Sequence, residues 1–324
     1  MLKKEAFRIV FMGTPEFAVP SLKAIIDSGY SVPAVITAPD KPSGRGKKLS
    51  PSAVKIFAEE QGIKVWQPAK LKDPQFLENL KKIDPHLQVV VAFRMLPQVV
   101  WDLPPYGTVN LHASLLPQYR GAAPINHAIM NGETKTGLTT FFLDKEIDTG
   151  KIILQKEMEI GKAETAGELH DRMMVAGADL LLETIEQIRL NQVNPLDQSA
   201  LTSVTGYLNP APKIFKEHCR IDWNKPGQDV FNMIRGLSPF PTAFTYLENP
   251  EGRQFLIKIY QAEFEPASGT HAVGSIHTDG KTFLKISVPN GYLFIKEIQL
   301  AGKKKLPIAD FLRGFHLDEN WKLV

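Results

Sequence analysis

Two polar segments of the chain carry the side chains best suited to acyl-transfer chemistry. In the segment 109–117, Asn110 and His112 are two residues apart and would share one face of an extended strand. In the segment 143–150, Asp148 stands just ahead of a run that we expect to form a strand. An Asn donor, a titratable His and an Asp can together stabilise a tetrahedral oxyanion and move a proton. Because the set contains no strong nucleophile, it favours direct transfer to an incoming amine over a covalent acyl-enzyme.

The same residues also allow a purely structural interpretation, because a His beside an Asn is most often a satisfied hydrogen-bonded pair. The spacing alone leaves both interpretations open. Gly13 opens a turn without further glycines, so a dinucleotide site is weakly supported. The other histidines show no metal-ligand spacing, and we expect no metal site from them: His86, His127, His170, His218, His271, His277 and His316.

The elements that must position the polar segments alternate between strands and helices in the first part of the chain. Hydrophobic periodicity predicts strands at 7–12, 31–37, 63–66 and 87–93, and helices at 17–29, 51–62 and 73–82. This alternation predicts an α/β domain with a doubly wound, Rossmann-like and mostly parallel sheet. Ligands of such sheets bind beyond the carboxyl ends of the strands, where both polar segments are expected to lie.

The second part of the chain has a different pattern. A long helix is predicted after Ala163, with a capping box from Thr165 to Glu168. Polar residues and prolines then dominate, and short strand-like runs follow at 255–260, 271–276, 283–288 and 292–300, which predicts a small antiparallel barrel or sandwich. We therefore expect a catalytic domain over 1–190, a linker over 191–209 and a second domain over 210–324.

Composition excludes several classes of protein. The 324 residues have a formal charge of +3, so the overall charge says little about nucleic acid and any such signal must be local. The apolar runs are far shorter than the roughly 20 residues needed to cross a bilayer, and we expect no membrane association. Cys219 is the only cysteine, which excludes an intrachain disulfide and fits a reducing cytoplasm.

The stretch from Asn110 to Ile125, NLHASLLPQYRGAAPI, resembles the N-x-H-x-S-L-L-P-x-x-R-G signature of enzymes that use 10-formyltetrahydrofolate. Ile147 to Gly150 resembles their second motif, and together the two are highly specific. The resemblance implies that Asn110 and protonated His112 stabilise the oxyanion on the formyl group. Asp148 would hold or tune His112, since a neighbouring carboxylate favours the imidazolium form.

The resemblance also implies a folate site. Residues of the first motif would line it, and the end of the predicted strand at 87–93 would contact the pterin ring. The residues implied are Ala92, Phe93, Arg94, Met95, Leu96, Pro97, Ser114, Leu115, Leu116, Pro117 and Asp144.

Two features favour tRNA as the acceptor. The segment 39–49 resembles the basic loop with which methionyl-tRNA formyltransferases engage the acceptor end of tRNA. A Gly-rich loop with several cations also suits contact with phosphates at a duplex end, although such a loop is often only a solvated surface. The resemblance extends to an OB-type C-terminal domain, a fold that often binds nucleic acid. The cations implied in tRNA binding are Lys41, Arg45, Lys47, Lys48, Lys303, Lys304 and Lys305.

The chain departs from the family pattern in three places. Phe93-Arg94 stands where a Tyr-Gly pair is usual, which removes a hydroxyl and adds a cation that we expect to point to solvent. Lys145-Glu146 replaces a Gly-rich stretch, and Phe240 replaces a Trp between two prolines. None of these changes affects Asn110, His112 or Asp148.

We therefore expect a formyltransferase that acts on methionyl initiator tRNA with 10-formyltetrahydrofolate as co-substrate. We expect it to use no metal. No protein partner is implied, and we expect a monomer. The nearest alternative is another 10-formyltetrahydrofolate enzyme whose acceptor is a nucleotide sugar, a ribonucleotide or water. An alternative of another class is a non-catalytic nucleic-acid-binding protein, and an NAD-dependent dehydrogenase is a third.

Overall fold

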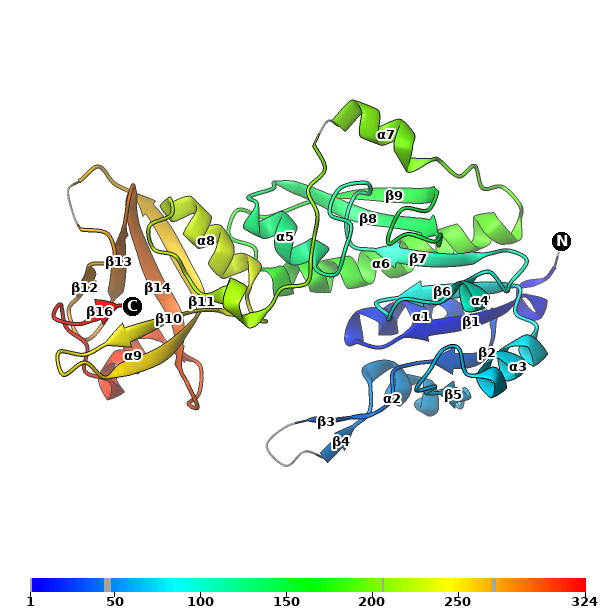
Figure 1. Cartoon of the computed structure of the whole chain (residues 1–324), viewed down its shortest axis with the longest axis horizontal. Helices are drawn as coiled ribbons and strands as arrows, with labels where there is room; N and C mark the ends of the chain where they lie inside the picture. The colour runs from blue at the N-terminus through cyan, green and yellow to red at the C-terminus, as the bar shows by residue number, and fades with distance from the viewer. Residues whose placement is uncertain (1, 44–47, 206, 270–271) are drawn as a thin grey trace. The chain divides into compact units, whose positions relative to one another are not determined.

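A computed structural model describes residues 2–43, 48–205, 207–269 and 272–324, without the side chains of 43, 48 and 202–205. The chain divides into two compact units that are interleaved along the sequence (Figure 1). The first unit comprises 1–121, 137–158 and 170–210, and the second comprises 122–136, 159–169 and 211–324.

The first unit is built on one mixed sheet. Its strands are β1 (Arg8–Gly13), β2 (Ser31–Ile36), β5 (Val65–Trp66), β6 (Leu87–Val91), β7 (Thr108–His112), β8 (Lys135–Phe142) and β9 (Ile152–Glu159). Their order in the sheet is β5-β2-β1-β6-β7-β8-β9. The first five strands in this order are parallel, and β8 is antiparallel to β7. Its helices are α1 (Val19–Asp27), α2 (Ala53–Glu60), α3 (Pro74–Ile83), α4 (Gln98–Trp101), α6 (Ala166–Arg189) and α7 (Gln198–Thr205). The prediction of a doubly wound, mostly parallel sheet is confirmed.

Helices cover both faces of this sheet, which explains why β6 is buried along its whole length and apolar except for Gln88. On one face, Val90 packs in a cluster with Leu80 of α3 and Val100 of α4. On the other face, α6 approaches β7 so closely that a Cβ atom at Gly177 would lie 2.8 Å from Leu111. The sheet is therefore held rigidly where β6 and β7 end.

Local sequence sets the ends of several elements. Ser52 caps α2 by accepting a hydrogen bond from the Lys55 amide, and Asp73 caps α3 in the same way. β6 ends at Val91, two residues earlier than predicted, because Ala92 adopts a left-handed conformation with φ of 48° that a strand cannot continue.

The second unit contains an antiparallel, barrel-like sheet. Its strands are β10 (Ala243–Glu248), β11 (Gln254–Pro266), β12 (Ile276–Thr278), β13 (Leu284–Val288), β14 (Gly291–Leu300), β15 (Leu306–Pro307) and β16 (Lys322–Leu323). The order is β12-β13-β14-β11-β10-β16, and β15 pairs with β14. Its helices are α5 (Pro124–Met130), α8 (Gly227–Gly236) and α9 (Ile308–Gly314). The predicted OB-type β-barrel class is confirmed, and its core is formed by alternate residues of the long strands.

One predicted strand of this unit, 271–276, is wrong. Of the described residues 272–276, only Ile276 belongs to a strand, because Gly274 lies in a turn with a φ of 81°. His271, at the start of the predicted strand, lies outside the described residues.

The predicted linker, 191–209, contains α7 and belongs by its contacts to the first unit. Conversely, 122–136 and 159–169 precede the predicted linker but belong to the second unit. The division into a catalytic domain, a linker and a second domain at 190 and 210 stays a prediction. Within the described residues, no helix is long and apolar enough to span a membrane.

Candidate active site

The strand β7 positions Asn110 and His112 on the same face of the first sheet. Asn110 is aligned with Val90 of β6 and with Phe141 of β8, and it is half-buried. His112 is the last residue of the strand and is 7% exposed. Because side chains alternate along a strand, both face away from the helix α6 that covers Leu111. No hydrogen bond joins the Asn110 side chain to another described residue, so its amide is available to a ligand.

A backbone carbonyl fixes the imidazole of His112. Its Nε2 lies 2.9 Å from the carbonyl oxygen of Tyr119. Since a carbonyl can only accept, Nε2 must carry a proton and donate it. The other nitrogen, Nδ1, faces Asp148 and lies 3.8 Å from its Oδ2. Nδ1 is therefore the nitrogen that can exchange a proton, and it is on the same side of the ring as the carboxylate.

Asp148 is held in an unusual backbone conformation. Its φ of 56° lies in the left-handed region, which costs about 1–3 kcal/mol for a residue other than glycine and persists only where surrounding contacts impose it. One such contact is the Gly121 amide, which donates to Asp148 Oδ2 over 2.9 Å. The carboxylate thus joins the two sequence motifs.

The glycine of the second motif is required by close packing. A Cβ atom at Gly150 would lie 1.7 Å from the carbonyl oxygen of Phe142, far inside the contact distance. The Phe142 amide donates to the carbonyl of Lys151, so this approach is part of the connection between β8 and β9. Only glycine allows the Asp148 loop to close at this point.

Sequence reasoning missed two contributors to this arrangement, the Tyr119 carbonyl and the Gln198 side chain. A backbone carbonyl has no residue-specific signal, and Tyr119 reaches its position with a φ of 59°. Gln198 lies in the polar stretch predicted as a linker, where one buried residue stands out only in the folded chain.

The residues of the first motif implied in folate binding lie mostly in the interior. The Ser114 hydroxyl donates to the carbonyl of Gln118 over 2.6 Å, and Leu116 packs with Phe141 and Ile152. Pro117 is also buried, whereas Leu115 is half-buried.

The segment 92–97 follows β6 and combines exposed and buried positions. Met95 is 74% exposed and Ala92 is exposed, while Leu96 belongs to the core cluster with Val90. Phe93 and Pro97 are half-buried. Asp144 is exposed, and its carboxylate accepts from the Lys145 amide.

The expectation that Arg94 points to solvent is wrong. Its Nη1 donates to the carbonyl of Ala69 over 3.0 Å and its Nη2 donates to the carbonyl of Pro68. The guanidinium is partly buried, and this burial lowers the pKa of Arg94 from its usual range. The hydrogen bonds to these two backbone carbonyls replace hydrogen bonds to water that the guanidinium would otherwise form. Arg94 therefore connects the loop after β5 to the end of β6.

The basic segment 39–49 includes the antiparallel pair of short strands β3 (Lys41–Ser43) and β4 (Lys48–Ser50), which we call the hairpin. Lys41 is exposed, whereas Arg45 and Lys47 and the side chain of Lys48 lie outside the described residues. Asp40, just before the hairpin, accepts from Lys55 Nζ over 2.7 Å and from the Gln67 amide over 2.7 Å.

The hydrogen bond from Lys55 is the main cause that lowers the pKa of Asp40. This carboxylate is therefore already paired with a cation outside the hairpin. It offsets little of the positive charge of the loop itself.

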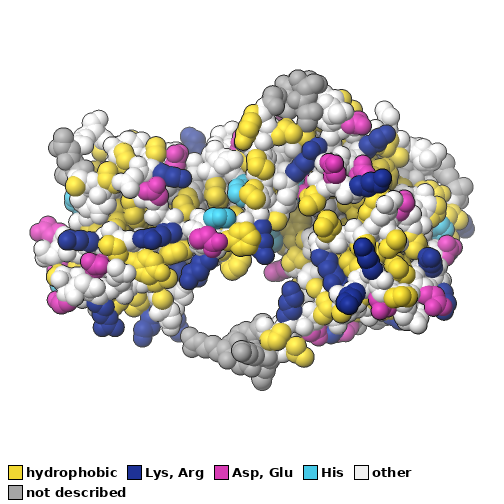
Figure 2. All heavy atoms as spheres, viewed as in Figure 1, with side chains coloured by type: hydrophobic (Ala, Val, Ile, Leu, Met, Phe, Trp, Pro, Cys, Tyr) yellow, Lys and Arg dark blue, Asp and Glu magenta, His cyan; other side chains and the backbone are white. Residues whose placement is uncertain are grey.

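The lysines 303–305 form the exposed turn between β14 and β15 of the second unit. Lys305 pairs with Glu297 over 2.7 Å and lies over the ring of Tyr260, whereas no ion pair within the described residues involves Lys303 or Lys304. Figure 2 shows Lys and Arg side chains interspersed with Asp and Glu over the viewed face. On this face, charges of both signs are therefore mixed.

Comparison with known proteins identifies the family. The formyl transferase family matches residues 7–185, and the C-terminal domain of formyl transferases matches 213–316. A methionyl-tRNA formyltransferase of Parabacteroides distasonis is 53% identical over 315 residues, which are 97% of each chain. A methionyl-tRNA formyltransferase of Bacteroides fragilis is 52% identical over 322 residues, which are 99% of each chain. The chain belongs to the methionyl-tRNA formyltransferase family.

Solved structures of more distant proteins share the fold of this methionyl-tRNA formyltransferase family member. The sugar 3N-formyl transferase WlaRD, crystallised in the presence of dTDP and 5-N-formyl-THF, matches with a TM-score of 0.64 and 21% identity, over 92% of this chain and 99% of WlaRD. The N-formyltransferase of Helicobacter canadensis, in complex with folinic acid and dTDP-3-aminofucose, matches with a TM-score of 0.64 and 20% identity, over 89% and 97% of the two chains.

The donor set suits the formyl chemistry of the methionyl-tRNA formyltransferase family. The free amide of Asn110 can donate to an oxygen, and Nδ1 of His112 can donate or accept according to its protonation. Within the described part of the chain, no group of three or more His, Cys, Asp or Glu side chains could hold a metal ion.

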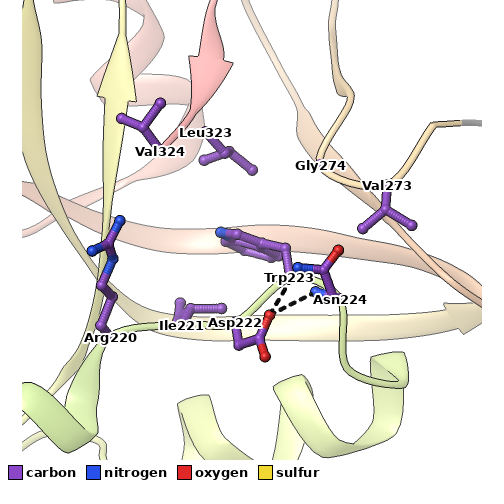
Figure 3. A pocket seen from close by; sticks show the side chains of 9 residues that line it. All are labelled: Arg220, Ile221, Asp222, Trp223, Asn224, Val273, Gly274, Leu323 and Val324. Atoms are coloured by element: carbon purple, nitrogen blue, oxygen red, sulfur yellow. Dashed lines mark hydrogen bonds between the residues drawn. The ribbon is translucent and has the colours of Figure 1, made fainter.

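Two surface cavities lie away from Asn110 and His112. One of about 480 Å³ is in the second unit, and Figure 3 shows Trp223 between Arg220 and Asn224 among the residues that line it. Another of about 470 Å³ lies beyond β5, where Pro68 and Ala69 contribute to its wall. The candidate active site is therefore identified by the side chains of Asn110, His112 and Asp148 and not by the volume of a cavity.

Proposed function

We propose that this chain is a cytoplasmic enzyme that transfers the formyl group of 10-formyltetrahydrofolate to the α-amino group of methionyl initiator tRNA. The observation that carries the proposal is the identity of 53% to a methionyl-tRNA formyltransferase over 97% of each chain. This similarity includes the hairpin and the C-terminal domain, in which the sequence suggests contacts to tRNA. The juxtaposition of Asn110, His112 and Asp148 supports the reaction type.

In the proposed mechanism, the Asn110 amide and the protonated Nδ1 of His112 donate to the formyl oxygen as the amine attacks. The nitrogen–carbon bond to the amine forms, and the bond from the formyl carbon to the folate nitrogen breaks. The amine loses one proton and the folate nitrogen gains one. Because Nε2 stays on the Tyr119 carbonyl, Nδ1 would carry this exchange, with Asp148 compensating the imidazolium charge.

The arrangement differs from that of a Ser-His-Asp triad, in which the carboxylate and the reacting group face opposite nitrogens of the imidazole. Here the carboxylate and the free nitrogen are on the same side, since a carbonyl occupies the other. Asp148 would therefore act on the proton at the reacting nitrogen. This geometry leaves Asp148 able to receive a proton from the amine through Nδ1 or directly.

We further propose that the folate binds between the segments 92–97 and 114–117, with Asp144 at the border. The exposed Ala92 and Met95 offer a surface to the pterin, while the buried residues of the first motif would act by shaping the wall behind it.

For tRNA, we propose that the hairpin of β3 and β4 presents Lys41, Arg45, Lys47 and Lys48 to the acceptor end. Lys303 to Lys305 would contact the phosphate backbone of the tRNA at another position. The pairing of Asp40 with Lys55 supports the first part, because it leaves the positive charge of the loop largely uncompensated.

The direct test is incubation of the purified chain with 10-formyltetrahydrofolate and methionyl initiator tRNA, with formyl-methionine measured on the tRNA. Parallel reactions with an amino nucleotide sugar, a ribonucleotide and water as acceptors test the nearest alternatives. We expect formylation of the charged tRNA to exceed the others by orders of magnitude. Preferential use of any other acceptor would overturn the proposal.

The role of the hairpin is tested with initiator tRNAs whose first base pair is either strong or mismatched. Unpairing the end costs less for the mismatched tRNA, so the wild type should favour it. Arg45→Ala should weaken this preference without changing the Kd of the formyl donor. Arg313→Ala, which removes an exposed arginine of α9, is the charge-matched control and should keep the preference. Equal discrimination by wild type and Arg45→Ala would show that Arg45 does not read that end.

A further inference from the structure

Gln198 has a buried amide side chain within 191–209, the polar stretch that was predicted to be a linker. It is the first residue of α7, and it is 2% exposed although its neighbours Ser199 and Ala200 are exposed. Burial of an amide side chain is unfavourable unless its donors and acceptor are all satisfied. The partners of Gln198 therefore indicate why it is there.

Those partners are the two motifs of the candidate active site. The Nε2 of Gln198 donates to the carbonyl oxygens of Asp148, over 3.0 Å, and of Gly150, over 2.8 Å. Its Oε1 accepts from Nε and Nη2 of Arg120, over 3.1 and 2.6 Å. Both protons and the oxygen of the amide are thus used. Arg120 is the arginine of the first motif and Gly150 is the glycine of the second.

The two carbonyls that Gln198 binds belong to the left-handed residue Asp148 and to Gly150, two residues later. Asp148 has the left-handed φ of 56°, and its carboxylate reaches both His112 Nδ1 and the Gly121 amide. Gly121 directly follows Arg120, so the backbone that donates to the carboxylate and the side chain that anchors Gln198 come from adjacent residues. Gln198 connects this arginine to the backbone carbonyls of Asp148 and Gly150.

We propose that Gln198 is a positioning residue that holds the Asp148 carboxylate at its distance from His112 by bridging Arg120 to the backbone of the Asp148 loop. The inference rests on the proposed function and deepens it. Within the described residues, the hydrogen bonds of the Gln198 side chain go to Arg120, Asp148 and Gly150 and not to His112 or Asn110, so it acts through the backbone of the Asp148 loop.

The decisive substitution is Gln198→Glu, which keeps the shape and the acceptor for Arg120 but removes both donors to the loop. We expect kcat to fall on the order of 10- to 100-fold, as for a misplaced catalytic group, with the KM of each substrate within about twofold of wild type. Hydrogen exchange of a peptide that contains Gly121 should become faster, because its amide loses a fixed acceptor. This second readout does not depend on activity.

A double-mutant cycle distinguishes positioning from a general loss of structure. In an Asp148→Asn background, Gln198→Glu should lower kcat by less than about threefold, because the carboxylate it positions is already absent. Gln192→Glu makes the same charge change at an exposed side chain six residues earlier and should leave all parameters unchanged. If Gln198→Glu does not fold, Gln198→Asn shortens the bridge without adding charge and is put through the same cycle.

Multiplicative effects of the two substitutions would overturn the inference, as would unchanged kcat or unchanged exchange at Gly121 in the folded variant. Absence of formyl transfer by the wild type itself would instead refute the proposed function. In that case the exchange measurement alone decides whether Gln198 positions the loop.

Discussion

The assignment of Nδ1 as the reacting nitrogen of His112 can be tested by replacing the imidazole with a side chain that keeps only the other nitrogen. In His112→Gln, the amide nitrogen can occupy the place of Nε2 and still donate to the Tyr119 carbonyl, which lies 2.9 Å from Nε2 in the wild type. Nothing replaces Nδ1. The substitution therefore removes the proposed chemistry while keeping the anchor.

The expected loss follows from the role of that nitrogen. Removal of one oxyanion donor costs about 2.7–4 kcal/mol in the transition state, which corresponds to a fall in kcat of about 100- to 1000-fold. The free energy of unfolding should change little, because the buried hydrogen bond is kept. In His112→Ala, the same fall in kcat should come with a loss of stability of about 1 kcal/mol or more, since the Tyr119 carbonyl loses its donor and a cavity remains.

The assay measures initial rates of formylation with both substrates saturating, the Kd of the formyl donor, and urea unfolding of wild type and both variants. We expect the two variants to share their kinetic defect and to differ in stability. A kcat of His112→Gln within tenfold of wild type would refute the role of Nδ1. A kcat of His112→Gln well above that of His112→Ala would show that Nε2 also contributes to the reaction.

Three other predictions concern the scaffold. Gly150→Ala should lower the free energy of unfolding by about 3 kcal/mol in urea titrations, because its Cβ atom would lie 1.7 Å from a backbone oxygen, whereas Gly314→Ala, with open space around it, should be neutral. Arg94→Met should cost about 2 kcal/mol of stability and alter the Kd of the formyl donor without changing acceptor preference, since two hydrogen bonds to backbone carbonyls are lost; unchanged thermal unfolding would contradict this. The hydrogen bond from Arg189 is the main cause that lowers the pKa of Glu186 from 4.5 to about 2, so this carboxylate stabilises the fold above pH 4.5 and its contribution is lost as the pH falls towards 2. Glu186→Gln should therefore be less stable than wild type at neutral pH and show a flatter loss of stability over that range, and parallel pH profiles would argue against the pairing.

Elements whose signals are local could be predicted from the order of the residues. The two-residue spacing of Asn110 and His112 placed them on one face of a strand, because side chains alternate along any extended chain. The capping box from Thr165 to Glu168 marked the start of α6, and its reciprocal hydrogen bonds are present. The α/β class of the first unit followed in the same way from alternating strand and helix periods.

Several boundaries failed where a single backbone angle decided them. The strand β6 ends just before Ala92 and β12 starts late because of left-handed residues, one of which is an alanine that gives no turn signal. The interleaving of the two units was also invisible, since it depends on which surface each helix packs against.

The contacts that hold the candidate site together form only in the folded chain. Gln198 meets the carbonyl of Asp148 across 50 residues and Arg120 across 78, and Arg94 leaves solvent for two carbonyls that lie 25 and 26 residues earlier. Every residue has a backbone carbonyl, so the residue types do not indicate which carbonyls will accept these hydrogen bonds. A polar side chain chooses among water and these acceptors only after folding has brought them within hydrogen-bond distance and removed the water.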